Sequence, residues 1–174
     1  PTMGWMFVPL TEYHGGGAAA TVEPLYQHLD HYGAMMLANL AYGAQACYRG
    51  PRLFDTDTTR ALVRRWVGWY KEYRDILESD VIHSSSRRAD GRDLDWVLHC
   101  NPRCATKAML VVWNPTDAEV KRSIPIDLYY AGLVDHAQAV GEDGVARDLV
   151  LDRLSRTAVE VVVPANGAVW FAIR

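Results

Sequence analysis

A carboxylate, a phenol and an imidazole follow one another in the segment "TEYHGGG", as Glu12, Tyr13 and His14. This segment begins directly after residues 5–10, "WMFVPL", which have the composition of a buried strand. In α/β sheets and barrels, ligands bind just beyond the carboxyl ends of the strands. Glu12 and His14 are therefore candidates for chemistry, and the alternative is a pair of solvated loop residues.

The glycines that follow these side chains leave the backbone of the loop unusually free. Gly15 and Gly16 can let a ligand approach the main chain closely, or can serve only as a connector. The glycine run lacks the spacing of a phosphate-binding loop and the Lys-Ser/Thr pair that ends one. The sequence therefore predicts no phosphate site here.

A second group of candidates occurs in the segment "YRGPRLFD", which contains Tyr48, Arg49, Arg52 and Asp55. Two arginines can clamp a carboxylate of a ligand. They can equally pair with Asp55 and with the nearby Asp57, and this structural interpretation is the favoured one. Together, the candidates for substrate binding are Tyr13, His14, Gly15, Gly16, Tyr48, Arg49 and Arg52.

Histidines and cysteines also occur close together, but not at the spacing of a metal site. His28 and His31 flank Asp30 without the HExxH pattern, and a polar helix face is the favoured interpretation. The segment from His99 to Cys104 lacks a second Cys/His pair at zinc-finger spacing, which favours buried free thiols. We expect no metal and no cofactor.

The composition is that of a folded protein with no strong charge. Of 174 residues, 49% are hydrophobic and 22% charged, and the formal net charge is −3, so neither nucleic acid nor an anionic membrane is an expected partner. The longest apolar stretch, residues 34–46, is shorter than the ~20 residues that cross a bilayer. Six Trp and nine Tyr favour aromatic cores over sugar sites. The compartment stays open.

The chain changes character near Asp80. Before it, helical periodicity predicts a first helix that starts at Glu23-Pro24, with Thr21 as its cap, and ends near Gly43 or Gly50. A second helix is predicted at about residues 56–77, with Asp55 or Asp57 as its cap. After it, short apolar runs separated by turn residues predict an antiparallel β-sandwich. The eight expected strands are residues 81–83, 95–100, 108–113, 121–126, 137–139, 148–151, 158–163 and 168–173. The predicted class is α+β, in two domains, residues 1–80 and 81–174.

Three motifs in this order resemble the C-terminal region of retaining α-galactosidase-like glycoside hydrolases. They are the helix end "YKEYR" at residues 70–74, the acidic linker "ESD" at 78–80 and the strand "LVVWN" at 110–114. The resemblance covers residues 5–133, and it rests on the order and spacing of elements. It implies the end of a (β/α)8 barrel, one strand and two helices in residues 1–80, followed by a sandwich in residues 81–174.

The resemblance also implies a carbohydrate substrate and a two-carboxylate mechanism. Glu12 is the only carboxylate at a strand end in the N-terminal half, and we expect it to be the acid/base or a ligand of sugar hydroxyls. The strand that would carry the nucleophile is not in this sequence, so the remainder of the barrel is an expected partner and the chain alone is expected to be inactive. The alternative is a non-catalytic carbohydrate-binding or structural sandwich that uses Trp96, Trp113 or Trp170.

Overall fold

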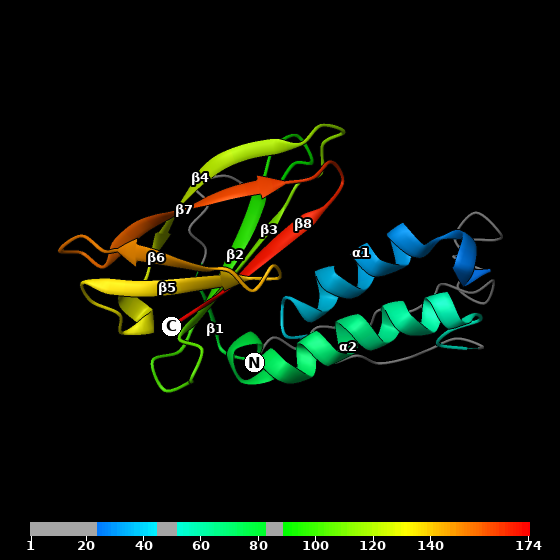
Figure 1. Cartoon of the computed structure of the whole chain (residues 1–174), viewed down its shortest axis with the longest axis horizontal. Helices are drawn as coiled ribbons and strands as arrows, with labels where there is room; N and C mark the ends of the chain where they lie inside the picture. The colour runs from blue at the N-terminus through cyan, green and yellow to red at the C-terminus, as the bar shows by residue number, and fades with distance from the viewer. Residues whose placement is uncertain (1–23, 45–51, 83–88) are drawn as a thin grey trace. The chain divides into compact units, whose positions relative to one another are not determined.

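The computed structural model of the chain describes residues 24–44, 52–82 and 89–174 (Figure 1). The chain divides into two compact units, Pro1–Glu78 and Ser79–Arg174. The expected strand at residues 5–10 and the glycine loop after it lie outside the described residues. Within the described residues, two helices precede antiparallel sheets, which confirms the α+β class, and no closed barrel occurs among them.

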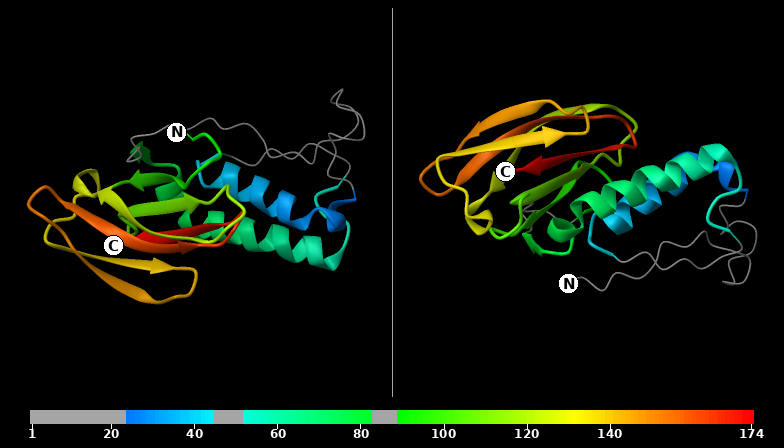
Figure 2. Two further views of the ribbon diagram at one scale, coloured as in Figure 1. Left: turned by 90° about the horizontal axis from the view of Figure 1, so that it is seen from above. Right: turned by 60° about the horizontal axis from the view of Figure 1, so that its bottom comes forward.

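The first unit contains the 3-10 helix η3 (Leu25–Gln27) and the helices α1 (Leu29–Leu40) and α2 (Asp57–Leu77). The prediction for residues 56–77 is confirmed. The prediction of one continuous helix from residue 24 is wrong, because His28 has φ −126° and separates η3 from α1. The two long helices lie side by side (Figure 2). A Cβ on Gly33 would be 3.2 Å from Leu62 Cδ1, so this glycine permits their close approach.

Helix α2 begins at a threonine cap. The hydroxyl of Thr56 accepts a hydrogen bond from the backbone N–H of Thr59, and the side chain of Thr59 accepts one from the N–H of Thr56. This reciprocal arrangement satisfies two of the N–H groups that a helix start leaves unpaired. The prediction that Asp55 or Asp57 caps the helix is therefore wrong. Asp55 instead accepts a hydrogen bond from the hydroxyl of Thr59, at 2.9 Å.

The second unit contains eight strands in two sheets. They are β1 (Asp80–Ile82), β2 (Asp95–Cys100), β3 (Ala108–Trp113), β4 (Val120–Asp127), β5 (His136–Gly141), β6 (Ala146–Val150), β7 (Arg156–Val163) and β8 (Ala168–Ile173). One sheet has the order β1-β2-β3-β8-β5-β6 and the other is the pair β4-β7, all antiparallel. The eight predicted strands are confirmed, with bounds within two residues of those expected. The largest shifts at a strand start are in β6 and β7, whose pairing begins at Ala146 and Arg156.

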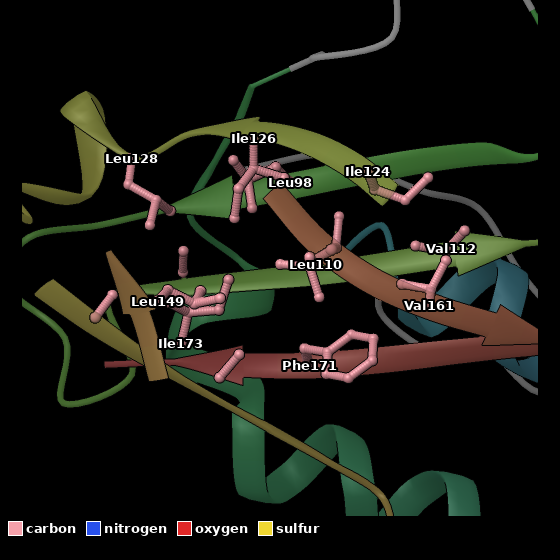
Figure 3. Packing of buried hydrophobic residues seen from close by; sticks show 14 of the residues in the cluster. Leu98, Leu110, Val112, Ile124, Ile126, Leu128, Leu149, Val161, Phe171 and Ile173 are labelled. Atoms are coloured by element: carbon pink, nitrogen blue, oxygen red, sulfur yellow. The ribbon is translucent and has the colours of Figure 1, made fainter. Parts of the chain in front are cut away.

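The core of this unit lies between its two sheets (Figure 3). Leu98, Leu110 and Phe171 come from the larger sheet, and they pack with Ile124 and Val161 from the β4-β7 pair. All five are less than one-tenth exposed. Alternate residues of each strand point to this layer, as expected for packed sheets.

A buried asparagine joins two turns at one end of the sandwich. The side-chain nitrogen of Asn114 lies 2.7 Å from Ala118 O, 3.1 Å from Val163 O and 3.0 Å from Pro164 O. Its side-chain oxygen accepts from both the N–H and the hydroxyl of Thr116. Asn114 is 2% exposed, so this pairing removes the cost of burying a polar amide.

The end of the helix pair gives a test with a matched control. Gly43 has φ +68°, and a Cβ there would overlap the carbonyl oxygen of Leu77. Gly68 lies on the exposed side of α2, and a Cβ there would meet nothing within 4 Å. We expect Gly43→Ala to lower the free energy of unfolding by about 1–3 kcal/mol. Gly68→Ala should raise it by up to about 1 kcal/mol, because alanine favours the helix.

Urea unfolding followed by circular dichroism measures both effects. A Gly43→Ala chain as stable as the wild type would contradict the described contact between the ends of α1 and α2.

Candidate functional site

One of the eight site residues predicted from the sequence lies in the described part of the chain, and it is Arg52. The other seven are Glu12, Tyr13, His14, Gly15, Gly16, Tyr48 and Arg49, and they lie outside it, as does Cys47. Whether these residues line a sugar pocket stays a prediction. The structure describes the surroundings of Arg52 and of the motifs that carry the family resemblance.

The segment that contains Arg52 is attached to the first helical elements. The hydroxyl of Tyr32 donates to the carbonyl oxygen of Leu53, at 2.9 Å, and the N–H of Tyr26 donates to Asp55 Oδ2, at 3.1 Å. Tyr32 is fully buried, so this bond satisfies a phenol in the interior of the unit. The residues from Arg52 to the start of α2 are therefore fixed to η3 and α1.

Asp55 is the carboxylate that the positive charge of Arg52 influences. Burial raises the pKa of Asp55, but hydrogen bonds from Tyr26 and Thr59, together with Arg52, outweigh it and lower the pKa below its usual value. Asp55 is thus an ionised anchor for the loop. Whether Arg52 has a structural role or binds a ligand carboxylate stays a prediction.

The motif at residues 70–78 forms a hydrogen-bonded group at the end of α2. The hydroxyl of Tyr70 donates to Glu78 Oε1 at 2.6 Å, and Arg74 Nε donates to the same oxygen at 2.8 Å. Glu78 is the C-cap residue of the helix. A carboxylate at a helix C-terminus opposes the helix dipole, and these two donors offset that repulsion.

In this group the carboxyl of Glu78 is ionised, whereas the phenol of Tyr70 keeps its proton. The hydrogen bond from Tyr70 is the main cause that keeps the pKa of Glu78 below its usual value; burial opposes it, and Arg74 adds to it. Burial, the hydrogen bond to Glu78 and the charge of Glu78 raise the pKa of Tyr70 to about 12. At neutral pH the group is therefore a neutral phenol, a carboxylate and a guanidinium. The motif that resembles a hydrolase helix end closes a helix here.

The histidine and the cysteine of β2 do not converge on one point. His99 is fully buried, and its Nδ1 lies 3.3 Å from the carbonyl oxygen of Ser79. Cys100 belongs to the core between the sheets, and burial raises its pKa to about 12, which keeps it a thiol. Neighbours on a strand point to opposite faces, so the two cannot share a ligand. In residues 24–44, 52–82 and 89–174, no three His, Cys, Asp or Glu residues are grouped as metal ligands.

The tryptophans proposed from the sequence as sugar contacts are partly buried. Trp96 packs against the core, and Trp113 and Trp170 are of intermediate exposure. Among the described residues of the sandwich, the exposed tyrosines are Tyr129 and Tyr130, at 68% and 59%. Sequence reasoning missed them. The signal was the position of the adjacent pair "YY" between two expected strands, since connecting segments lie on the surface.

Several solved structures share this fold. α-Galactosidase I from Mortierella vinacea matches with a TM-score of 0.55 and 11% identity, over 82% of this chain and 35% of that one. An α-amylase from Geobacillus thermoleovorans, solved with acarbose, matches with a TM-score of 0.55 and 12% identity, over 84% and 33%. AmyP in complex with maltose matches with a TM-score of 0.54 and 9% identity, over 83% and 34%.

This similarity establishes a fold. The chain spans about a third of the length of these enzymes. The unit Ser79–Arg174 is little more than half of the chain, so a match over 82% of it also includes part of the helical unit. No protein-family model matches the chain, and no curated protein matches it in sequence. None of the described helices has the length and apolar character needed to span a bilayer.

The group at the end of α2 predicts how stability changes with pH. Because the folded-state pKa of Glu78 is lowered, its contribution is complete above the unfolded carboxyl pKa and is lost as the pH falls through the folded value. Because the pKa of Tyr70 is raised, its contribution is complete below pH 10 and is lost as the pH rises toward about 12. We expect Tyr70→Phe and Glu78→Gln each to cost on the order of 1 kcal/mol at neutral pH.

Urea unfolding between acid and alkaline pH measures this dependence. The difference between wild type and Glu78→Gln should shrink in acid, and the difference for Tyr70→Phe should shrink in alkali. Glu72→Gln, an exposed position of the same helix, is the control and should change stability little. Equal and pH-independent effects in all three variants would contradict the assignment.

Proposed function

We propose that this chain is the C-terminal part of a (β/α)8-barrel glycoside hydrolase of the α-galactosidase-like kind. The observation that carries the proposal is a helical unit followed in one chain by an eight-stranded sandwich, with the fold similarity to an α-galactosidase extending beyond the sandwich. The helical unit supplies the last βα portion of the barrel. The sandwich stabilises the barrel.

The segment at residues 12–17 lines the sugar pocket in this proposal. It follows the apolar run at residues 5–10, which would be a late barrel strand, and barrel enzymes place their sites at that end of the strands. Tyr13 and His14 would contact sugar hydroxyls, and the two glycines Gly15 and Gly16 would leave room for the sugar. Tyr48, Arg49 and Arg52 would belong to a neighbouring loop.

Glu12 is the acid/base of the proposed reaction. It donates a proton to the glycosidic oxygen as the bond to the anomeric carbon breaks, while a nucleophilic carboxylate from the rest of the barrel forms a covalent glycosyl intermediate. Glu12 then removes a proton from the water that hydrolyses this intermediate. The chain alone lacks the nucleophile and is expected to be inactive.

A second candidate is a non-catalytic carbohydrate-binding or structural module. The observation in its favour is that Ser79–Arg174 is a compact unit with its own core between two sheets. The two functions differ in what they require of Glu12. A binding module does not need that carboxylate, whereas the hydrolase cannot complete its second step without it.

The test uses the chain expressed continuously with the polypeptide encoded upstream of Pro1. We expect hydrolysis of aryl α-galactosides by this longer protein and none by residues 1–174 alone. In Glu12→Gln, kcat/KM should fall on the order of 10²–10⁴-fold for an alkyl α-galactoside, whose leaving group needs protonation. It should change little for a dinitrophenyl α-galactoside, whose leaving group does not, and azide should raise kcat by replacing the activated water.

Glu23→Gln is the matched control, since the sequence places this carboxylate at a helix start instead of a strand end. It should leave the kinetics unchanged. A loss in Glu12→Gln that is the same for good and poor leaving groups would rule out the acid/base role. Turnover by residues 1–174 alone would contradict the dependence on the missing barrel.

A further inference from the structure

Two adjacent tyrosines stand out on the surface of the sandwich. Tyr129 and Tyr130 form the 3-10 helix η4 (Tyr129–Ala131), which connects β4 to β5 (Figure 1). Both side chains are more than half exposed. Large aromatic side chains gain from burial, so two that remain side by side in water mark a surface with a function more often than a single exposed residue does.

The pair is held in a defined geometry. The two ring centroids are 5.4 Å apart with an angle of 87° between the planes, so the edge of one ring meets the face of the other. The N–H of Tyr129 donates to Asp127 Oδ1 at 3.0 Å, which fixes the start of η4. Gly132, at φ +70°, ends it. Neither phenol hydroxyl has a hydrogen-bond partner among the described residues.

Polar groups of opposite charge lie beside the aromatic pair. Asp127 and Arg156 are register partners at the end of β4 and β7, and Arg156 Nε is 3.7 Å from Asp127 Oδ2. Both side chains are exposed, at 38% and 60%. The terminal nitrogens of Arg156 donate to no described residue, so they remain available to a ligand. The opposite charges of Asp127 and Arg156 offset each other, and both groups can hydrogen-bond to the hydroxyls of a ligand.

Backbone hydrogen bonds hold this region to the neighbouring turn. The N–H of Leu128 donates to Ser155 O at 2.9 Å, and the N–H of Leu151 donates to Asp135 O at 2.8 Å. These two hydrogen bonds, one before and one after η4, therefore connect the segment that carries the tyrosines to the turn that precedes Arg156. A preorganised surface of this kind binds at a lower entropic cost than mobile loops do.

We propose that Tyr129, Tyr130, Asp127 and Arg156 form a binding surface for a neutral carbohydrate chain. A sugar ring has faces of C–H groups and edges of hydroxyls. The C–H faces pack on an aromatic ring, whose face is negative, and the hydroxyls pair with phenol, carboxylate and guanidinium groups. The proposal concerns binding alone and does not require the catalytic function proposed above, so either can fail without the other.

A second copy of this chain is the competing occupant. Val134, Val150 and Leu154 are also exposed and belong to the same segments, and a dimer would bury them. Stable interfaces bury about 800 Å² on each partner around an apolar centre. The unpaired hydroxyls and the Asp127–Arg156 pair would be costly at such a centre. A sugar satisfies them.

Affinity electrophoresis of the full 174-residue chain in native gels tests the proposal. The gels contain galactomannan, amylose or xylan, and the wild type should be retarded by at least one of them. Tyr130→Ala and Tyr129→Ala should each weaken the apparent affinity about tenfold, because a stacking surface is lost. Tyr130→Phe should retain most of it, and Arg156→Gln should weaken it about threefold. Thermal unfolding confirms that each variant is folded.

Tyr26→Ala is the matched control, because Tyr26 is a half-exposed tyrosine in the other unit. It should not change the retardation. The proposal is overturned if none of the three polysaccharides retards the wild type, or if Tyr26→Ala weakens binding as much as Tyr130→Ala. It is also overturned if size-exclusion chromatography shows a dimer that Tyr130→Ala dissociates.

Discussion

The sandwich depends on the meeting of two apolar sheet faces. Leu110 and Phe171 from the larger sheet can leave water only because the β4-β7 pair supplies Ile124 and Val161 opposite them. At about 25 cal/mol for each Å² of apolar surface, this burial is the main force that orders the turns around it. The exposed features follow from it. Asn114 ties turns that the strands have already brought together, and η4 projects its tyrosines because the strand before it ends at Asp127.

Elements with a periodic pattern of apolar residues could be predicted from the sequence. Details that depend on a single hydrogen bond or backbone angle could not. Eight strands and the helix at residues 56–77 follow from periodicity and turn residues, and all are present. The cap of α2 could not be predicted, because Asp55, Thr56 and Asp57 are all residue types that cap helices well. In the folded chain Asp55 accepts hydrogen bonds from Tyr26 and Thr59, and Thr56 is the cap. The break at His28 likewise depends on backbone geometry that composition does not encode.

The candidate site was predictable to a smaller extent. The group of Tyr70, Arg74 and Glu78 is separated by four residues at each step, and helix geometry brings such residues to one side. The sequence alone does not show that Tyr70 and Arg74 both donate to Glu78 Oε1 and so stabilise the helix end. The exposed tyrosines were not predicted, because aromatic residues of a β-rich sequence are expected in the core. The proposed roles of Glu12 and its neighbours depend only on their position in the sequence.

In the proposed function the two units have different roles: the sandwich closes its own core, and the helical unit would be part of a larger barrel. Native-state hydrogen exchange of the whole chain tests this division most directly. We predict that amides of β3 (Ala108–Trp113) exchange only through global unfolding, whereas those of α1 (Leu29–Leu40) exchange through an opening of lower free energy. Exchange of α1 and β3 with the same free energy at every urea concentration would contradict this division between the two units.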